Sequence, residues 1–200
     1  RSHTASMAGS DEAASALFER LGIARVQDLD TLIESLKLLH VHGPLKGNRL
    51  CSMSCSGGEA SLMADTALGR DVVFPELTPE QHDAVAKTVH ELVSVSNPLD
   101  YHTFAWNKEE DLFATYSAML ACGFDLSMLV LDFPREDRCN LETWDPAVNA
   151  ITRSVDKTGA ATAVVASLPE SLPEAVATEL MGRGIAPLCG IRQVLDAAQA

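Results

Sequence analysis

A glycine pair directly follows a short apolar run in the segment CSGGEAS, residues 55–61. Gly57 and Gly58 allow the backbone to turn tightly and to approach a ligand closely. If a helix begins here, its free N–H groups and the positive end of its dipole favour an anion such as phosphate. Ser56, Gly57, Gly58 and Glu59 are therefore the candidate phosphate-binding residues.

A glycine turn that only connects a strand to a helix explains the same residues, so both interpretations stand at this point. The segment has neither the Lys and Ser/Thr of a Walker A loop nor the full glycine pattern of a dinucleotide-binding loop. Glu59 would lie in the first turn of the helix, where a glutamate commonly caps its own helix. Its negative charge disfavours a bound phosphate unless the side chain points away.

Two further loops are expected beside the glycine pair. SNPLD follows a strand-like run and contains Asn97 and Pro98, and DFPRED ends an almost continuously apolar run. Parallel sheets bind ligands at the edge formed by the carboxyl ends of their strands, so these loops should share one edge with the glycine pair. Asn97 and Pro98 are the candidate substrate-side loop residues.

The cysteines and histidines do not form a metal-binding pattern. Cys51 and Cys55 are four residues apart, but no histidine pair at metal-ligand spacing accompanies them, so no metal site is expected. The five cysteines are an odd number and widely spread, which favours reduced, buried thiols of a cytoplasmic protein. Cys55 beside the helix start is interpreted as a packing thiol rather than a nucleophile.

Composition limits the classes of partner. The 200 residues carry a formal net charge of −13, which argues against nonspecific nucleic-acid binding but leaves small anions open, because backbone amides can hold them. No apolar run approaches the roughly 20 residues of a membrane helix, and no signal peptide is recognisable, so a cytoplasmic protein without a membrane partner is expected. The missing initiator methionine predicts a fragment of a larger protein.

Apolar runs alternate with amphipathic stretches after residue 43. Strand-like runs are expected at 49–56, 71–75, 93–96, 126–133, 160–169 and 185–189. Helices are expected at 59–68, from Pro79 with Thr78 as its cap, and at 109–122, 146–157, 173–183 and 191–199. This alternation predicts an α/β three-layer sandwich around a mostly parallel, five-stranded sheet in the flavodoxin-like order.

Residues 1–42 differ from the rest. SDEAASALFERLG predicts a capped helix ending at Gly22, RVQDLDTLIESLKLL a short strand and a second amphipathic helix, and HVHGPLKGN a linker. Two helices and one short strand cannot enclose a core. Residues 1–42 are therefore expected to be the C-terminal remnant of a preceding α/β domain, and residues 43–200 a second domain.

The stretch SHTASMAGSDEAASALFERLGIARVQDLDTLIESL resembles the phosphohistidine segment of the succinyl-CoA synthetase superfamily, particularly its nucleoside-diphosphate-forming acyl-CoA synthetases. The matching elements are Ser2-His3-Thr4-Ala5, Ala8-Gly9-Ser10-Asp11, Gly22-Ile23-Ala24-Arg25-Val26 and Leu29 to Leu32. Ala5 stands where glycine is commoner in the family. GNRLCSMSCSGGEASLMADTA is similar to the opening of the family's succinyl-CoA-ligase-like flavodoxin domain, and VSNPLDY to its xxNPxD turn.

The resemblance implies that His3, otherwise an unremarkable loop histidine, is the catalytic phosphoryl carrier, and that the glycine-rich helix start is one of two helix termini that hold its phosphate. It also implies an ADP-forming acid-CoA ligase that uses CoA, ATP and Mg²⁺ and forms acyl-phosphate and phosphohistidine intermediates. The CoA-binding Rossmann and ATP-grasp domains, in the same chain or a partner subunit, are implied as partners. Neither is recognisable here, so these residues alone are expected to bind no cofactor and to be inactive.

Two alternatives remain at this point. The chain could be a non-catalytic regulatory or scaffolding module of a CoA-ligase-like/acetyltransferase fusion protein, which the neighbouring sequence would distinguish. A flavodoxin-like flavin binder is disfavoured, because the first loop lacks the hydroxyl-rich T/S-x-T-G-x-T phosphate cradle.

Overall fold

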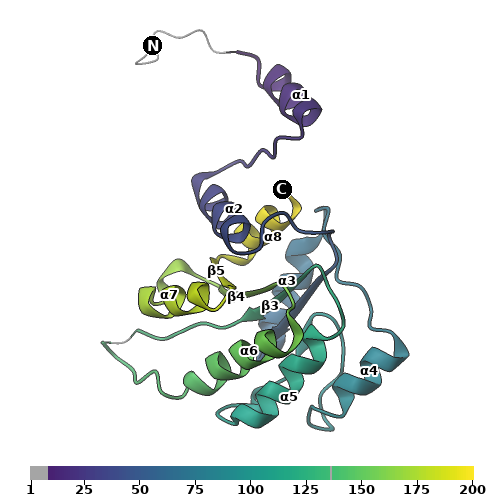
Figure 1. The fold of residues 1–200 in the computed structure, drawn as a ribbon, viewed down its shortest axis with the longest axis vertical. Helices are drawn as coiled ribbons and strands as arrows, with labels where there is room; N and C mark the ends of the chain where they lie inside the picture. Colours follow the sequence, from purple (N-terminus) through teal and green to yellow (C-terminus); the bar gives the residue numbers. More distant parts are fainter. Residues whose placement is uncertain (1–8, 136) are drawn as a thin grey trace.

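A computed structural model describes residues 9–135 and 137–200, which contain a single parallel sheet (Figure 1). Its strands are β1 (Leu50–Ser54), β2 (Leu99–Asp100), β3 (Leu126–Val130), β4 (Thr162–Ala166) and β5 (Ile185–Cys189). They lie in the order β2-β1-β3-β4-β5, and all four pairings are parallel. This is the flavodoxin-like doubly wound order, so the expected fold class is confirmed.

Helices cover both faces of the sheet. One face is packed by α4 (Pro79–Ala86), α5 (Glu109–Leu120), α6 (Asp145–Thr158) and α7 (Glu174–Gly182). The other face is packed by α2 (Leu29–His42), α3 (Gly57–Ala67) and α8 (Ile191–Gln199). Every residue of β1, β3 and β4 is buried, which explains why their sequences are continuous apolar or small-residue runs rather than alternating ones.

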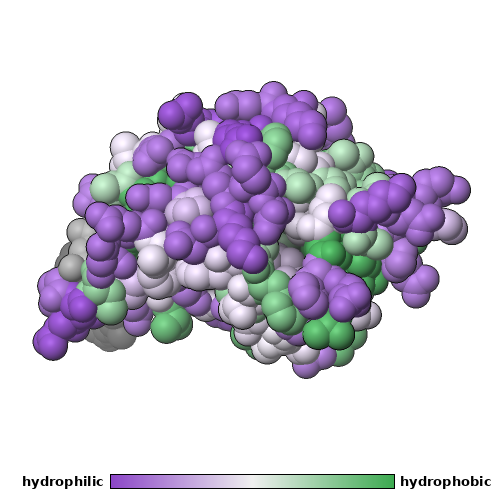
Figure 2. Space-filling model, turned by 90° about the horizontal axis from the view of Figure 1, so that it is seen from below, coloured by the Kyte–Doolittle hydropathy of each residue, from purple (hydrophilic) through white to green (hydrophobic). Residues whose placement is uncertain are grey.

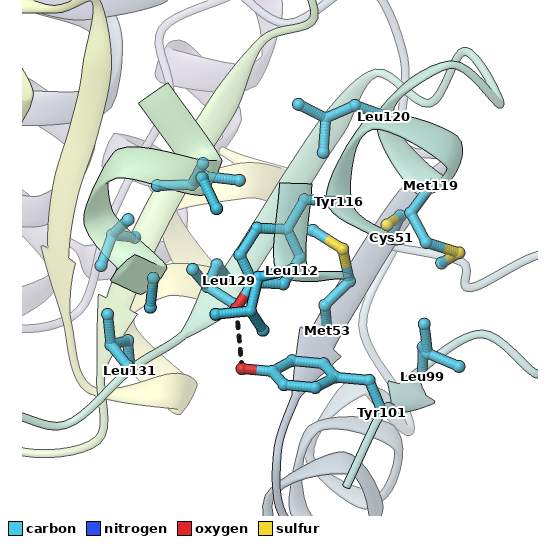
Figure 3. Close-up of a cluster of buried hydrophobic side chains, with 14 of the residues drawn as sticks. Cys51, Met53, Leu99, Tyr101, Leu112, Tyr116, Met119, Leu120, Leu129 and Leu131 are labelled. Atoms are coloured by element: carbon cyan, nitrogen blue, oxygen red, sulfur yellow. Dashed lines mark hydrogen bonds between the residues drawn. The ribbon is translucent and has the colours of Figure 1, made fainter. Parts of the chain in front are cut away.

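The core on the α5 side contains a buried polar contact. The Tyr116 hydroxyl, on α5, donates to the Tyr101 hydroxyl, which follows β2, at 2.8 Å (Figure 3). Both rings are almost fully buried, and they pack edge to face with centroids 5.5 Å apart. The pair ties α5 to the segment that leaves β2, because a buried hydroxyl is stabilised only when it is hydrogen-bonded.

Most expected elements are present, and several begin as their sequences predict. Thr78 caps α4 through a capping box with Gln81, and Pro79 is the first helical residue. The expected strand 185–189 and helix 191–199 have the same bounds as β5 and α8. Within the described ranges, no helix has the length and apolarity required to cross a membrane.

Three expected strands are wrong. Residues 71–75 contribute only one parallel bridge, between Val73 and Arg49, and Pro75 has no N–H with which to continue a ladder. Residues 93–96 form no strand, and β2 follows them at Leu99 and Asp100, where it pairs with the end of β1. The residues before α2 are not a strand either, since Arg25 lies in an irregular segment and its side chain pairs with Asp11.

The two N-terminal helices differ in how they contact the sheet. Helix α1 (Asp11–Leu21) has no buried residue, and in Figure 1 it stands apart from the rest of the molecule. Helix α2 packs against α8 and β5. Leu38 of α2 is only 3% exposed, and the buried Glu34 carboxylate accepts a hydrogen bond from the Cys189 N–H at 3.0 Å. Helix α2 therefore belongs to the helical layer of this sheet.

Candidate functional site

The loops after β1, β2 and β3 surround a cavity of about 580 Å³ at the carboxyl edge of the sheet. Its lining residues are Cys55, Glu59, Thr103, Trp106, Val130, Leu131, Asp132 and Trp144. The two tryptophan rings meet edge to face, with centroids 5.3 Å apart. The cavity lies at the edge where parallel sheets bind ligands, and it combines aromatic walls with two carboxyl groups.

The glycine pair lies at the strand-to-helix junction that the sequence predicts. After β1 the chain turns at Ser56, which is the N-cap of α3, and Gly57 is the first helical residue. The Ser56 side chain makes no capping hydrogen bond, while the Ser54 hydroxyl donates to the Ser56 carbonyl at 2.9 Å. The first N–H groups of a helix have no acceptor within it, so the amides of Gly57, Gly58 and Glu59 face outward from the first turn.

Glu59 does not cap α3, so that expectation is wrong. Its Oε2 is completely buried and has no hydrogen-bond partner in the described part of the chain. Burial, followed by the charges of Asp132 and Asp100, raises the pKa of Glu59 from 4.5 to about 7. The carboxyl group is therefore partly protonated near neutral pH, even though it sits at the positive end of a helix dipole.

Two carboxylates near Glu59 were not predicted as site residues. A Cβ placed on Gly57 would lie 3.1 Å from Asp100 Oδ2, so glycine permits this carboxylate to approach the helix start. Asp100 is held by the His102 N–H at 2.9 Å. Asp132 lines the cavity, and its Oδ1 accepts a hydrogen bond from the Ser167 N–H at 2.7 Å. Both lie in the segments SNPLD and DFPRED, which the sequence places at this edge of the sheet, and that position is the signal that could have identified them.

Asn97 and Pro98 do not line the cavity. The Asn97 side chain lies at the sheet edge, where its Oδ1 accepts from the Ser52 N–H at 3.2 Å. Its Nδ2 donates to the carbonyls of Leu50 at 2.9 Å and Pro75 at 3.1 Å. These bonds join the chain just before β2 to β1 and to the segment that follows Val73. The observed contacts of Asn97 are therefore structural.

The cysteines are free, and burial dominates the environment of those near the sheet. Burial raises the pKa of Cys51 to about 12. The pKa of Cys55 is also raised, first by burial and then by Glu59. A raised pKa keeps the thiol protonated, which agrees with a packing role for Cys55. Among the residues with described positions, no group of three or more His, Cys, Asp or Glu side chains could hold a metal ion. His3 lies outside the described residues.

Comparison with known proteins finds sequence similarity over parts of the chain. A family model described as "Succinyl-CoA ligase like flavodoxin domain" matches residues 1–39. An ADP-forming acetate–CoA ligase of Methanocaldococcus jannaschii is 25% identical over 100 residues, which make up 50% of this chain and 14% of the ligase. Both matches are similarities over part of the chain only.

Solved structures have the same fold over nearly the whole chain. PH0766 from Pyrococcus horikoshii OT3 superposes with a TM-score of 0.78 and 20% identity, covering 96% of this chain and 43% of PH0766. The dinucleotide forming acetyl-coenzyme A synthetase 1 of Ca. Korarchaeum cryptofilum, in complex with phosphate and ADP, gives a TM-score of 0.77 and 18% identity, covering 98% of this chain and 41% of the synthetase. This chain therefore spans less than half the length of either solved chain.

Proposed function

We propose that these residues are part of an ADP-forming acyl-CoA synthetase, which makes acyl-CoA from a carboxylic acid, CoA and ATP. The observation that carries the proposal is the family match over residues 1–39, because this segment includes the Ser2-His3-Thr4 loop. The fold of the remaining residues, which is like that of an acetyl-CoA synthetase, supports it. ATP, CoA and Mg²⁺ are expected to bind mainly to other domains of the intact enzyme.

In this proposal His3 carries the phosphoryl group between two partial reactions. A ring nitrogen of His3 attacks the γ-phosphorus of ATP, an N–P bond forms and ADP leaves. The carboxylate of the substrate then takes the phosphoryl group, which regenerates His3 and forms an acyl phosphate. The CoA thiolate attacks the acyl carbon and releases phosphate. The amides at Ser56, Gly57, Gly58 and Glu59 would hold the phosphoryl group in one of these states.

An exposed apolar surface supports contacts with further domains. Eight large apolar side chains of residues 17–39 are exposed, namely Leu17, Leu21, Ile23, Leu29, Leu32, Ile33, Leu36 and Leu39. By contrast, the face on the side of α4, α5 and α6 is mostly hydrophilic (Figure 2). Because such apolar surface favours contact with another protein surface, we propose that the segment before α2 ends a preceding α/β domain and that the exposed side of α2 contacts that domain. Residues 43–200, together with α2 in their helical layer, then form the flavodoxin-like domain, and CoA-binding and ATP-grasp domains are the proposed partners.

The test is phosphorylation of His3 in the native protein that contains these residues, together with its ATP-grasp domain. Incubation with radiolabelled ATP and Mg²⁺ should place an acid-labile, base-stable phosphate on the peptide containing His3. His3→Ala should abolish both labelling and acyl-CoA formation, because the covalent carrier is lost. His82→Ala is the matched control, since His82 is exposed on α4 and should leave labelling unchanged.

Full acyl-CoA synthesis by the His3→Ala protein would refute the proposal. If the folded native protein is not labelled and forms no acyl-CoA with any carboxylic acid tested, the regulatory or scaffolding alternative replaces it.

A further inference from the structure

We infer that Glu59 must carry its proton when a phosphoryl group binds at the start of α3, where the neutral carboxyl group donates a hydrogen bond to that group. The inference rests on the proposed phosphate site at residues 56–59 and adds how that site selects its ligand. Glu59 is then a binding residue whose proton enters the site together with the anion.

The position of the side chain is the first argument. Glu59 is the third residue of α3, and it lines the cavity together with Asp132. Its Oε2 is completely buried, yet no N–H or O–H of the described residues donates to it. A buried carboxylate oxygen without a donor is costly, whereas a neutral carboxyl group loses much less on burial. The site therefore favours the protonated form and leaves its O–H available to an incoming acceptor.

The surrounding charges are the second argument. Three segments packed near Glu59 present titratable groups: the thiol of Cys55 directly after β1, and the carboxylates of Asp100 in β2 and Asp132 after β3. The His102 Nε2 lies 3.5 Å from the Asp100 Oδ2, so this histidine also faces the group of carboxylates. The buried Tyr101 has a pKa raised well above its usual value, so it stays neutral.

Helix α8 also packs against α3, but its charged side chains are engaged elsewhere. Asp196 pairs with Arg70 at 2.7 Å, and Arg192 contacts Asp28 at 3.4 Å. None of the cavity-lining residues is a Lys or Arg that could neutralise Glu59. With its pKa raised to about 7, chiefly by burial, Glu59 changes charge close to neutral pH.

The consequence for an anion follows from charge. When Glu59 is ionised, a phosphoryl group at the α3 amides meets a third nearby carboxylate and gains no donor from it. When Glu59 is neutral, one repulsive charge is removed and one hydrogen-bond donor is added. Because of linkage, anion binding should fall as the pH rises through the pKa of Glu59, and binding above that pH should take up a proton.

Sulfate is the probe for the test, because it stays doubly charged throughout the neutral range, whereas inorganic phosphate itself titrates there. Sulfate is added to this chain at constant ionic strength at pH 6 and pH 8, while the amide resonances of Gly57, Gly58 and Glu59 are followed by NMR. The expected result is a dissociation constant about tenfold higher at pH 8 than at pH 6, because most of Glu59 changes from neutral to ionised over this interval.

Two variants isolate Glu59 from other titrating groups. Glu59→Gln keeps the size and a donor but cannot ionise, so its sulfate affinity should be nearly equal at both pH values. Glu80→Gln changes an exposed first-turn glutamate of α4 and should keep the tenfold change. Equal affinity of the unmodified chain at pH 6 and pH 8 overturns the inference while leaving the phosphate site intact. Absence of shifts at these amides at either pH removes the proposed phosphate site, and the inference with it.

Discussion

Replacing Asn97 with alanine is expected to lower the free energy of unfolding by about 2–6 kcal/mol. The side chain makes three hydrogen bonds, one accepted from the Ser52 N–H and two donated to the carbonyls of Leu50 and Pro75. These bonds replace the backbone ladder that a continuous edge strand would provide beside β1. Alanine can make none of them.

The magnitude follows from the burial of the partners. Leu50 and Ser52 are 0% and 1% exposed, so their freed carbonyl and N–H groups have little access to water. A buried polar group left without a partner costs about 1–3 kcal/mol, and two such groups give the expected range. The Pro75 carbonyl is in a half-buried residue and can be hydrated, so it adds little.

Urea unfolding measures the effect, followed by tryptophan fluorescence and by far-ultraviolet circular dichroism. Asn140→Ala is the matched control, because among the described residues that exposed amide hydrogen-bonds with Glu142 alone, and a change below about 0.5 kcal/mol is expected. Asn97→Asp keeps the acceptor for Ser52 but loses both donated bonds at neutral pH, so a loss similar to that of alanine is expected. If both Asn97 variants unfold like the unmodified chain, the bridging role assigned to Asn97 is wrong.

Three other substitutions test the site and the packing. Glu59→Gln should raise the free energy of unfolding by about 1–2 kcal/mol at pH 8 but not at pH 4. The pKa of Glu59 is raised from 4.5 to about 7, so the unmodified protein loses stability as the pH rises through that interval. Equal differences between the two proteins at both pH values would contradict the environment assigned to Glu59. Leu38→Ala should lower the free energy of unfolding by about 2–4 kcal/mol, whereas Leu36→Ala, at an exposed position, should lower it by less than about 0.5 kcal/mol. Equal urea midpoints for these two variants would show that α2 is not part of the sheet unit. Tyr116→Phe removes the hydrogen bond to Tyr101 and should lower the same free energy by about 1 kcal/mol in thermal or urea unfolding, whereas an unchanged stability would exclude a stabilising role for that bond.

The elements that could be predicted from sequence are those whose signals are local. The capping residue Thr78 and the following Pro79 identify the start of α4 without any tertiary information. The strand-to-helix junction at Gly57 has the same character, because a glycine pair after a buried run is a local signal. Alternation of such units also predicts the parallel sheet, since consecutive parallel strands require crossover helices.

Edge pairing was decided only by the tertiary structure. Residues 71–75 have the apolar pattern of a strand, yet only Val73 bridges to β1, and two residues at Leu99–Asp100 form β2 instead. Which of two segments pairs with β1 depends on how the intervening chain packs, and a periodicity of apolar residues contains no information about that. The Asn97 side chain joins these two pieces through contacts that are distant in sequence.

In the candidate site, too, some features could be predicted from sequence and others depended on the tertiary structure. Sequence alone determined that Glu59 lies in the first turn of a helix and that backbone amides are free there, because both follow from local geometry. The tertiary structure decided what Glu59 meets. Folding brings Asp100 and Asp132 from two other strand ends to the same sheet edge and buries Oε2 without a donor. The protonation of a side chain depends on solvent access and on charges in space, and only the folded chain sets those distances.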